Sequence, residues 1–140
     1  MTEAAAPRLL ETLHDRARDL VTGTAADACV ISRVLGDVLV IVTHVTDGAP
    51  LDLGQGFLIS DYPLTQVVVR SGEPAQLTIE DEDADPAEAR LLRELGFAAL
   101  LMLPLEVVGE RWGLIELYRR SAEHFAPHEV ANARALARIG

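Results

Sequence analysis

The side chains best suited to catalysis or metal binding are few and widely spaced in this sequence. Cys29 is the one cysteine, so it has no partner for an internal disulfide, a zinc cluster of paired thiols or a thiol redox relay. His14, His44, His124 and His128 do not pair with a carboxylate or thiol at metal-ligand spacing. No Ser–His–Asp or Cys–His arrangement is indicated either. We therefore predict no catalytic residue, no metal site and no cofactor, and a chain that is not an enzyme.

Two of these residues leave alternatives open. Cys29 stands in an apolar run and is interpreted as a small buried hydrophobe. His44 follows the alternating face of Val38, Val40 and Val42, so it could enter a cavity and bind haem. The alternative is a solvated histidine at the end of a strand.

An acidic run is the strongest local concentration of charge. Glu80, Asp81, Glu82, Asp83 and Asp85 fall within six positions. Such a run could favour a cationic or amine-bearing ligand, or a divalent ion. The alternative is a solvated loop before a helix N-terminus, where negative charge is favourable.

Composition limits the partners of the chain. It has 140 residues, of which 49% are hydrophobic, so it is long enough for one domain with its own core. The net charge of −10 disfavours nucleic acid and anionic membranes as partners. The sequence shows no signal peptide at Met1 and no apolar run of about 18 residues, so a cytoplasmic location is predicted. All twelve basic residues are arginine, which indicates a GC-rich bacterial genome.

Helices and strands that would position these side chains alternate along the chain. Hydrophobic periodicity and turn residues predict helices over about 7–23, 63–70, 85–96 and from 127 to the last residue, with strands over 28–34, 38–46, 75–79, 98–105 and 112–118. Asp85 is the expected N-cap of the third helix, and Glu88 would complete a capping box. Phe125 and Val130 would form a hydrophobic staple at the start of the fourth.

Four segments resemble one family in residues as well as in order. They are Val68-Val69-Arg70-Ser71-Gly72-Glu73-Pro74, Leu92-Arg93-Glu94-Leu95-Gly96-Phe97 with the following strand, Gly109 with Gly113-Leu114-Ile115, and Phe125-Ala126-Pro127-His128-Glu129. Together they are similar to the GAF domain, of a bacterial and actinobacterial sensory type. The resemblance covers nearly the whole chain. It implies one GAF domain over 1–140, the N-terminal part of a longer signalling protein.

The resemblance also implies the architecture. The expected fold is a mixed α/β (α+β) GAF/PAS-like domain, with a central antiparallel sheet of five to six strands. The terminal helices would cover one face, and residues 54–97 would enclose a ligand cavity on the other. The expected lining of that cavity is Phe57, Tyr62, Leu64, Val67, Val68, Asp81, Leu92, Phe97, Leu101 and Leu103.

The known ligand chemistries of the family fit this chain poorly. Methionine sulfoxide reduction needs several cysteines. The segment Ser60-Asp61-Tyr62-Pro63 is similar to a phytochrome segment that faces a bilin, but a cysteine for the thioether and a covering histidine are missing. The alternative is that Ser60 or Asp61 caps the next helix. The Asn-Lys pair of the cyclic-nucleotide branch is also missing.

Two functions remain as hypotheses. The first is a regulatory sensory module that binds an unidentified small molecule and relays a conformational change through its C-terminal helix to a fused output domain. The second is a ligand-free homodimerisation scaffold. The heptad-like spacing of Leu10, Leu13, Ala17 and Leu20 favours a homodimer through the terminal helices. Large side chains at every cavity position would favour the scaffold, and an open cavity with convergent polar groups would favour the sensor.

Overall fold

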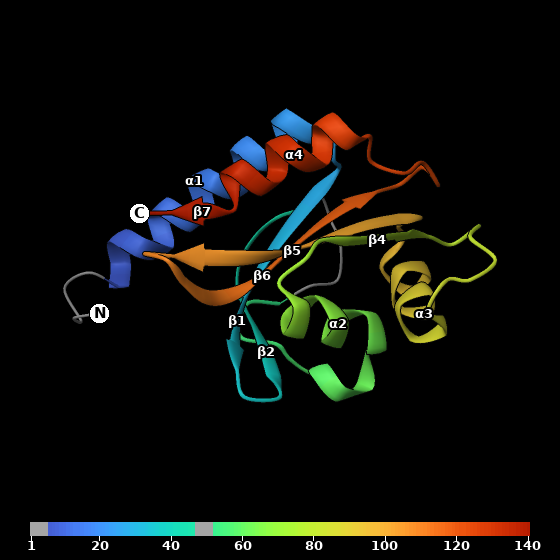
Figure 1. Ribbon diagram of the computed structural model, residues 1–140, viewed down its shortest axis with the longest axis horizontal. Coiled ribbons are helices and arrows are strands. Elements are labelled where there is room, and N and C mark those ends of the chain that lie inside the picture. Colours follow the sequence, from blue (N-terminus) through green and yellow to red (C-terminus); the bar gives the residue numbers. More distant parts are fainter. Residues whose placement is uncertain (1–5, 47–51) are drawn as a thin grey trace.

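A single twisted sheet with helices on both faces makes up the described part of the chain (Figure 1). The computed structural model describes residues 6–46 and 52–140. The sheet has seven strands in the order β3-β2-β1-β6-β5-β4, with β7 paired to β5. The predicted fold class and the placement of the terminal helices on one face are confirmed. The sheet has one strand more than the five to six expected, and this strand, β7, pairs in parallel with β5. The elements are α1 (Ala6–Thr24), β1 (Ala28–Leu35), β2 (Val38–Val45), β3 (Gly56–Leu58), the 3-10 turn η1 (Ile59–Asp61), α2 (Pro63–Ser71), β4 (Ala75–Thr78), α3 (Pro86–Leu95), β5 (Ala99–Val107), β6 (Glu110–Arg119), α4 (Pro127–Leu136) and β7 (Arg138–Ile139).

The centre of the sheet is formed by two hairpins that pair through β1 and β6. In the β5–β6 turn, Val108 and Gly109 both have positive φ (51° and 76°), as a tight two-residue hairpin requires. Valine is unfavourable in that conformation, so the turn carries local strain. Gly113 lies where β6 approaches the backbone of β1, and a Cβ there would collide with the carbonyl oxygen of Ser32.

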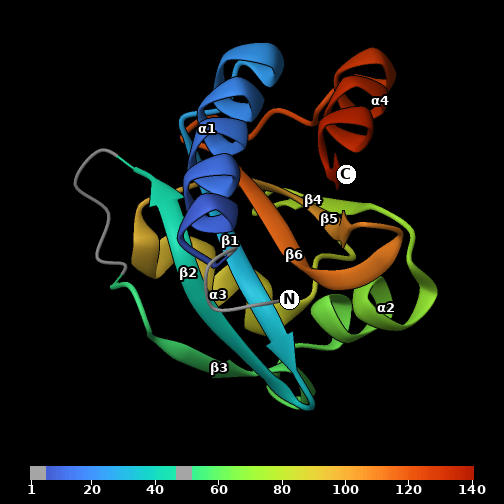
Figure 2. The ribbon, with the colours of Figure 1, turned by 90° about the vertical axis from the view of Figure 1, so that its left-hand side faces the viewer.

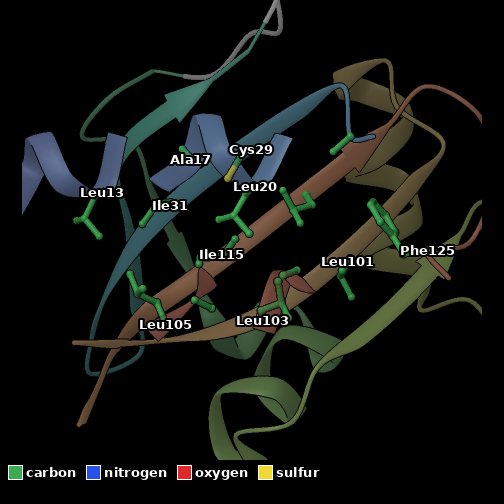
Figure 3. Packing of buried hydrophobic residues seen from close by; sticks show 14 of the residues in the cluster. Leu13, Ala17, Leu20, Cys29, Ile31, Leu101, Leu103, Leu105, Ile115 and Phe125 are labelled. Atoms are coloured by element: carbon green, nitrogen blue, oxygen red, sulfur yellow. The ribbon is translucent and has the colours of Figure 1, made fainter. Parts of the chain in front are cut away.

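The first face of the sheet is covered by α1 and α4, which lie side by side (Figure 2). Alternating strand residues point into this layer, and Figure 3 shows their packing. The fully buried side chains of this cluster include Leu13, Ala17, Leu20, Ile31, Leu101, Leu103, Leu105, Ile115 and Leu117. Cys29 is also buried here, in agreement with its interpretation as a small hydrophobe. Leu10 differs from its expected stripe partners because it is 45% exposed.

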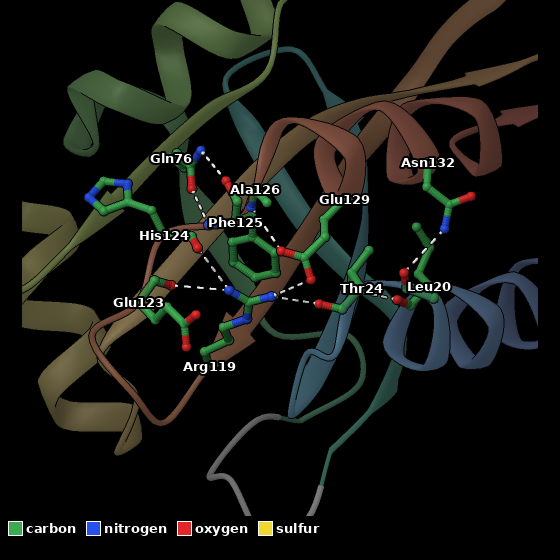
Figure 4. Close-up of polar contacts among 11 residues, drawn as sticks. Leu20, Thr24, Gln76, Arg119, Glu123, His124, Phe125, Ala126, Glu129 and Asn132 are labelled. Carbon is green, nitrogen blue, oxygen red and sulfur yellow. Dashed lines mark hydrogen bonds and ion pairs between the residues drawn. The ribbon is translucent and has the colours of Figure 1, made fainter.

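Arg119 connects the ends of the elements that form this first layer (Figure 4). Its guanidinium donates to the carbonyl oxygens of Thr24 (2.7 Å) and His124 (2.9 Å) and pairs with the Glu129 carboxylate at 2.8 Å. It also lies 3.9 Å from the centre of the Phe125 ring. The predicted segment at the start of α4 therefore serves packing: Phe125 lies beneath the arginine, and Glu129 Oε1 accepts from the Ala126 amide at 2.8 Å.

The last helix is shorter than predicted. We expected it to continue to Gly140, but α4 ends at Leu136 and the chain continues as β7. The cause is the open edge of β5, whose amides at Glu106 and Val108 donate to the carbonyl oxygens of Ala137 (3.0 Å) and Ile139 (2.7 Å). Backbone groups at a sheet edge need hydrogen-bond partners, and here they bind the segment that hydrophobic periodicity had predicted to be helical.

The second face is covered by α2 and α3, whose N-termini share one capping residue. Asp85 accepts from the Ala87 amide of α3 (3.1 Å) through one oxygen and from the Leu64 amide of α2 (2.9 Å) through the other. Asp85 as the cap of α3 is confirmed. The predicted capping box is wrong, because Glu88 turns inward to the sheet. The proposed caps of α2 are replaced as well: Ser60 donates its hydroxyl to Asp37 at 2.6 Å, and α2 takes its cap from Asp85.

Candidate functional site

A small cavity lies between the second face of the sheet and the helices α2 and α3. Its volume is about 20 Å³, which is room for about one water molecule. Most of its wall is apolar, but two carboxylates, two tyrosines and a threonine also face it. The lining residues are Val30, Leu39, Ile41, Phe57, Tyr62, Thr65, Glu88, Leu91, Leu95, Glu116 and Tyr118.

Glu88 reaches the cavity from the first turn of α3 and is 2% exposed. It accepts a hydrogen bond from the hydroxyl of Thr65 on α2. Burial, and next the nearby charge of Glu116, raise the pKa of Glu88 to about 8, although the Thr65 hydrogen bond acts in the opposite direction. At neutral pH this carboxyl group therefore holds a proton for most of the time.

Glu116 reaches the same cavity from the middle of β6 and is partly buried. The Tyr118 hydroxyl donates to Glu116 Oε2 at 2.9 Å. Burial raises the pKa of Glu116 to about 7, and this hydrogen bond limits the rise. Among the described residues, no ion pair includes Glu88 or Glu116, so both acids lack a cationic side chain to compensate their charge.

A second hollow is an open groove between α2 and the acidic loop, with a volume of about 440 Å³. Asp81 in its wall accepts from the Thr78 amide and from His124, each at 2.8 Å. These contacts lower the pKa of Asp81, with the Thr78 backbone hydrogen bond as the largest cause. Asp81 thus stabilises its own loop. In the described residues no group of three or more His, Cys, Asp or Glu side chains is placed to hold a metal ion.

Half of the predicted lining residues face one of these two spaces. Phe57 and Tyr62 line the enclosed cavity, with their rings in edge contact at 6.2 Å. Leu64, Val67 and Asp81 line the open groove instead. The predicted set therefore combined two separate spaces, which sequence spacing did not distinguish.

The other predicted lining residues are packing residues. Val68, Leu92 and Phe97 are buried in the core beneath α2 and α3, and Phe97 stacks on Tyr118 at 4.9 Å. The placement of Leu101 and Leu103 on the cavity face is wrong. Both belong to the cluster beneath α1 and α4, because side chains alternate along β5 and its even-numbered residues face the cavity side.

Sequence reasoning missed four polar lining residues: Thr65, Glu88, Glu116 and Tyr118. Tyr118 lies on the cavity face of the sheet, opposite the layer of α1 and α4. A signal for Glu116 was present, because a carboxylate amid Leu114, Ile115 and Leu117 in a buried strand has no solvent-facing side to occupy. Glu88 gave no such signal, since its position also fits a capping box.

The remaining candidate histidine forms a local contact. His44 Nδ1 is hydrogen-bonded to Thr46 Oγ1 at 3.0 Å, and His44 is not among the described residues that line the cavity. None of the helices in 6–46 and 52–140 is long and apolar enough to cross a membrane.

The architecture and the cavity position can now be compared with known proteins. The model of the GAF domain family matches residues 8–139. The chain belongs to the GAF domain family. No curated protein matches the sequence.

Solved structures with this fold are similar over most of the chain. The GAF domain of Thermosynechococcus elongatus PixJ, in its blue-light absorbing form, superposes with a TM-score of 0.82 at 17% identity, covering 99% of this GAF domain and 85% of that chain. The GAF domain of a two-component sensor histidine kinase from Bacillus halodurans gives 0.74 at 16%, covering 91% and 86%. A GAF domain/HD domain protein from Geobacter sulfurreducens gives 0.75 at 18%, also covering 91% and 86%. At these identities the likeness establishes the fold.

Proposed function

We propose that this GAF domain is a regulatory sensory module, which binds a small-molecule effector and passes a conformational change through its C-terminal segment to a fused output domain. The observation that carries the proposal is the convergence of Glu88 and Glu116 on one small cavity. Buried acids without a cationic partner are unfavourable for folding, and perturbed acids in a hollow are typical of functional sites. The module is proposed to act through binding and without catalysis.

A route from the cavity to the C-terminal segment supports the second half of the proposal. The Thr65 hydroxyl, which donates to Glu88, also lies 3.5 Å from the sulfur of Met102 on β5. The far end of β5 holds β7 through the amides of Glu106 and Val108. An effector that moves Glu88 would disturb Thr65 and β5, and thereby the pairing of β7.

The family context agrees with this reading. Two of the similar structures come from a sensor histidine kinase and from a protein that combines a GAF domain with an HD domain. A fused kinase, cyclase, phosphatase or transcription regulator is the kind of output domain we propose.

Native mass spectrometry of the freshly purified 140-residue chain tests ligand binding. A defined extra mass, lost on Glu116→Gln, is the expected result, and the mass identifies the effector class. Glu110→Gln is the matched control, because Glu110 lies on the same strand and is exposed. A bare protein that gains no mass from a metabolite extract contradicts the sensor proposal.

Amide hydrogen exchange tests the relay once a bound species is known. Binding is expected to change exchange at Glu106 and Val108, whose amides hold β7, while the amides of central β1 stay protected. Binding with no change in β7 or α4 contradicts the relay.

A ligand-free homodimerisation scaffold is the second candidate, and two observations favour it. The cavity is almost filled by the protein's own side chains, since it has room for about one water molecule. Leu10 on the outer side of α1 is 45% exposed, beside Glu11, His14 and Arg18 in an open hollow. A bare dimer in the same mass spectrum, disrupted by Leu10→Glu, supports the scaffold, whereas a bare monomer contradicts it.

A further inference from the structure

The polar groups that line the cavity indicate which ligand charge it favours. Its polar groups are acidic or neutral: Glu88 from α3, Glu116 and Tyr118 from β6, Thr65 from α2, and Tyr62 just before α2. No arginine, lysine or histidine occurs among the described residues that line it. Glu88 is 2% exposed, and its charge has no ion-pair partner in the described chain. A space with two carboxyl groups and no cationic side chain in its described lining is suited to a cation, because the cation favours the ionised forms of both acids.

We propose that this cavity binds the ammonium group of a small alkylammonium ligand, with Glu88 and Glu116 as its counter-charges and Phe57 and Tyr62 against its alkyl chain. The proposal rests on the sensory function above and names the chemical class of its effector.

Size and shape agree with an ammonium head. An NH₃⁺ group is about as large as a water molecule, and the cavity of about 20 Å³ has room for one. Its three N–H donors need acceptors, and Glu88, Glu116 and the Thr65 hydroxyl supply oxygen atoms from three different elements. The structure thus provides acceptors on several sides of one water-sized space.

The mouth of the cavity suits the rest of such a ligand. Phe57, Tyr62, Leu91 and Leu95 line the cavity and are only partly buried, so they form its solvent-facing rim. The Phe57 and Tyr62 rings lie in edge contact. Aromatic rings attract alkylammonium groups through their faces and cover apolar chains as well. The net charge of −10 adds a long-range attraction for cations.

Binding of a cation should release protons. The surrounding titratable groups are Glu88 and Asp85 at the start of α3, Glu116 and Tyr118 on β6, Tyr62 before α2 and Cys29 on β1. The raised pKa values of Glu88 and Glu116 mean that these acids hold protons near neutral pH. An ammonium group favours their ionised forms and lowers both pKa values. Its affinity should therefore increase with pH up to about 8 and level off above that value.

Calorimetric titration of the 140-residue chain with three probes tests the inference. The probes are n-butylammonium, n-butanol and butyrate, which share a chain length and differ in charge. Butylammonium is expected to bind, with proton release measured in buffers of different ionisation enthalpy, and about tenfold more tightly at about pH 8.5 than at about pH 6. Glu88→Gln and Glu116→Gln should each weaken it about tenfold or more, and Glu110→Gln should leave it unchanged.

The outcomes separate this inference from the proposed function. Binding of butanol or butyrate as tight as that of butylammonium overturns the cationic ligand and leaves a small-molecule sensor in place. Butylammonium binding that neither glutamine variant weakens overturns this site. If none of the three probes binds, the alkylammonium inference is wrong, and native mass spectrometry decides the sensory function independently. Thermal unfolding of each variant confirms that a lost affinity does not reflect a lost fold.

Discussion

The two faces of the sheet are each covered by a pair of helices, but the buried ionisable side chains have different partners on the two faces. Beneath α1 and α4, the buried guanidinium of Arg119 has a carboxylate partner at 2.8 Å and three carbonyl acceptors. Beneath α2 and α3, the acids Glu88 and Glu116 each accept a hydrogen bond from a hydroxyl group, and both line one water-sized space.

This difference separates a structural layer from the layer in which we propose that the effector binds. A charge whose partners are all supplied by the chain stabilises one arrangement of the elements that it connects. A buried acid without a counter-charge is unfavourable when ionised, and either a proton or a bound cation can neutralise it. The first face thus holds the domain together, and the second is the face to which we assign the proposed effector site.

The largest expected effect is on the first face. Arg119→Ala leaves the Glu129 carboxylate and several carbonyl groups without their donor, so it should lower the free energy of unfolding by about 4 kcal/mol. Urea denaturation, followed by circular dichroism, measures this change in the free energy of unfolding. Arg134→Ala is the matched control, because the ion pair of Arg134 with Glu73 (3.1 Å) is exposed at the surface, so a loss below about 1 kcal/mol is expected. Similar losses in both variants would contradict the structural role of Arg119.

Leu103→Ala probes the same face through packing. Leu103 is fully buried beneath α1 and α4, so truncation should cost about 3 kcal/mol by removing contacts and leaving a cavity. Leu95→Ala, at the partly buried rim of the other face, should cost about 1 kcal/mol. The same denaturation experiment compares them. If the two losses were equal, the first face would not be the more tightly packed layer.

Glu116→Gln tests the second face through pH. The pKa of Glu116 is raised from 4.5 to about 7 in the folded state, so folding takes up a proton between these values. The protonated Glu116 therefore contributes to the free energy of unfolding. This contribution is complete below pH 4.5 and is lost as pH rises through about 7. Relative to the glutamine variant, the natural protein should lose on the order of 2 kcal/mol between about pH 5 and about pH 9, because Glu116 is only partly buried and solvent screens part of the effect. Unfolding curves at several pH values measure this difference, and parallel curves would contradict it.

The smallest effect separates two neighbouring residues of α2. Val67 is 57% exposed in the open groove, so Val67→Ala should change stability by less than about 0.5 kcal/mol. Val68 is fully buried, and Val68→Ala should cost about 2 kcal/mol. Thermal unfolding of both variants checks the contrast. A loss at Val67 as large as that at Val68 would mean that the groove is covered in solution, for example by a second copy of the chain.

Local patterns in the sequence were sufficient for most of the fold. Asp85 and Gly96 bound α3 as predicted, because a cap and a left-handed stop act within a few residues. The motifs around Phe125 and Gly109 indicated the family, and the resemblance implied that the terminal helices cover one face of the sheet. The seventh strand was missed, since β7 forms only because the distant edge of β5 offers free amides.

The site was decided by tertiary structure. The sequence alone placed residues 112–118, which include Glu116, in a buried strand, although the role of that carboxyl group was missed. That one cysteine and dispersed histidines provide no catalytic group stays a prediction. It did not determine which face each residue of β5 occupies, and a shift of one residue moved Leu101 and Leu103 to the opposite layer. Nor did it show that Glu88 faces the cavity that Glu116 also lines, because only the packed structure brings these residues of α3 and β6 to one space. Helix caps and turns depend on residues that are neighbours in the sequence, whereas the charge environment of a cavity depends on many contacts between residues far apart in the sequence.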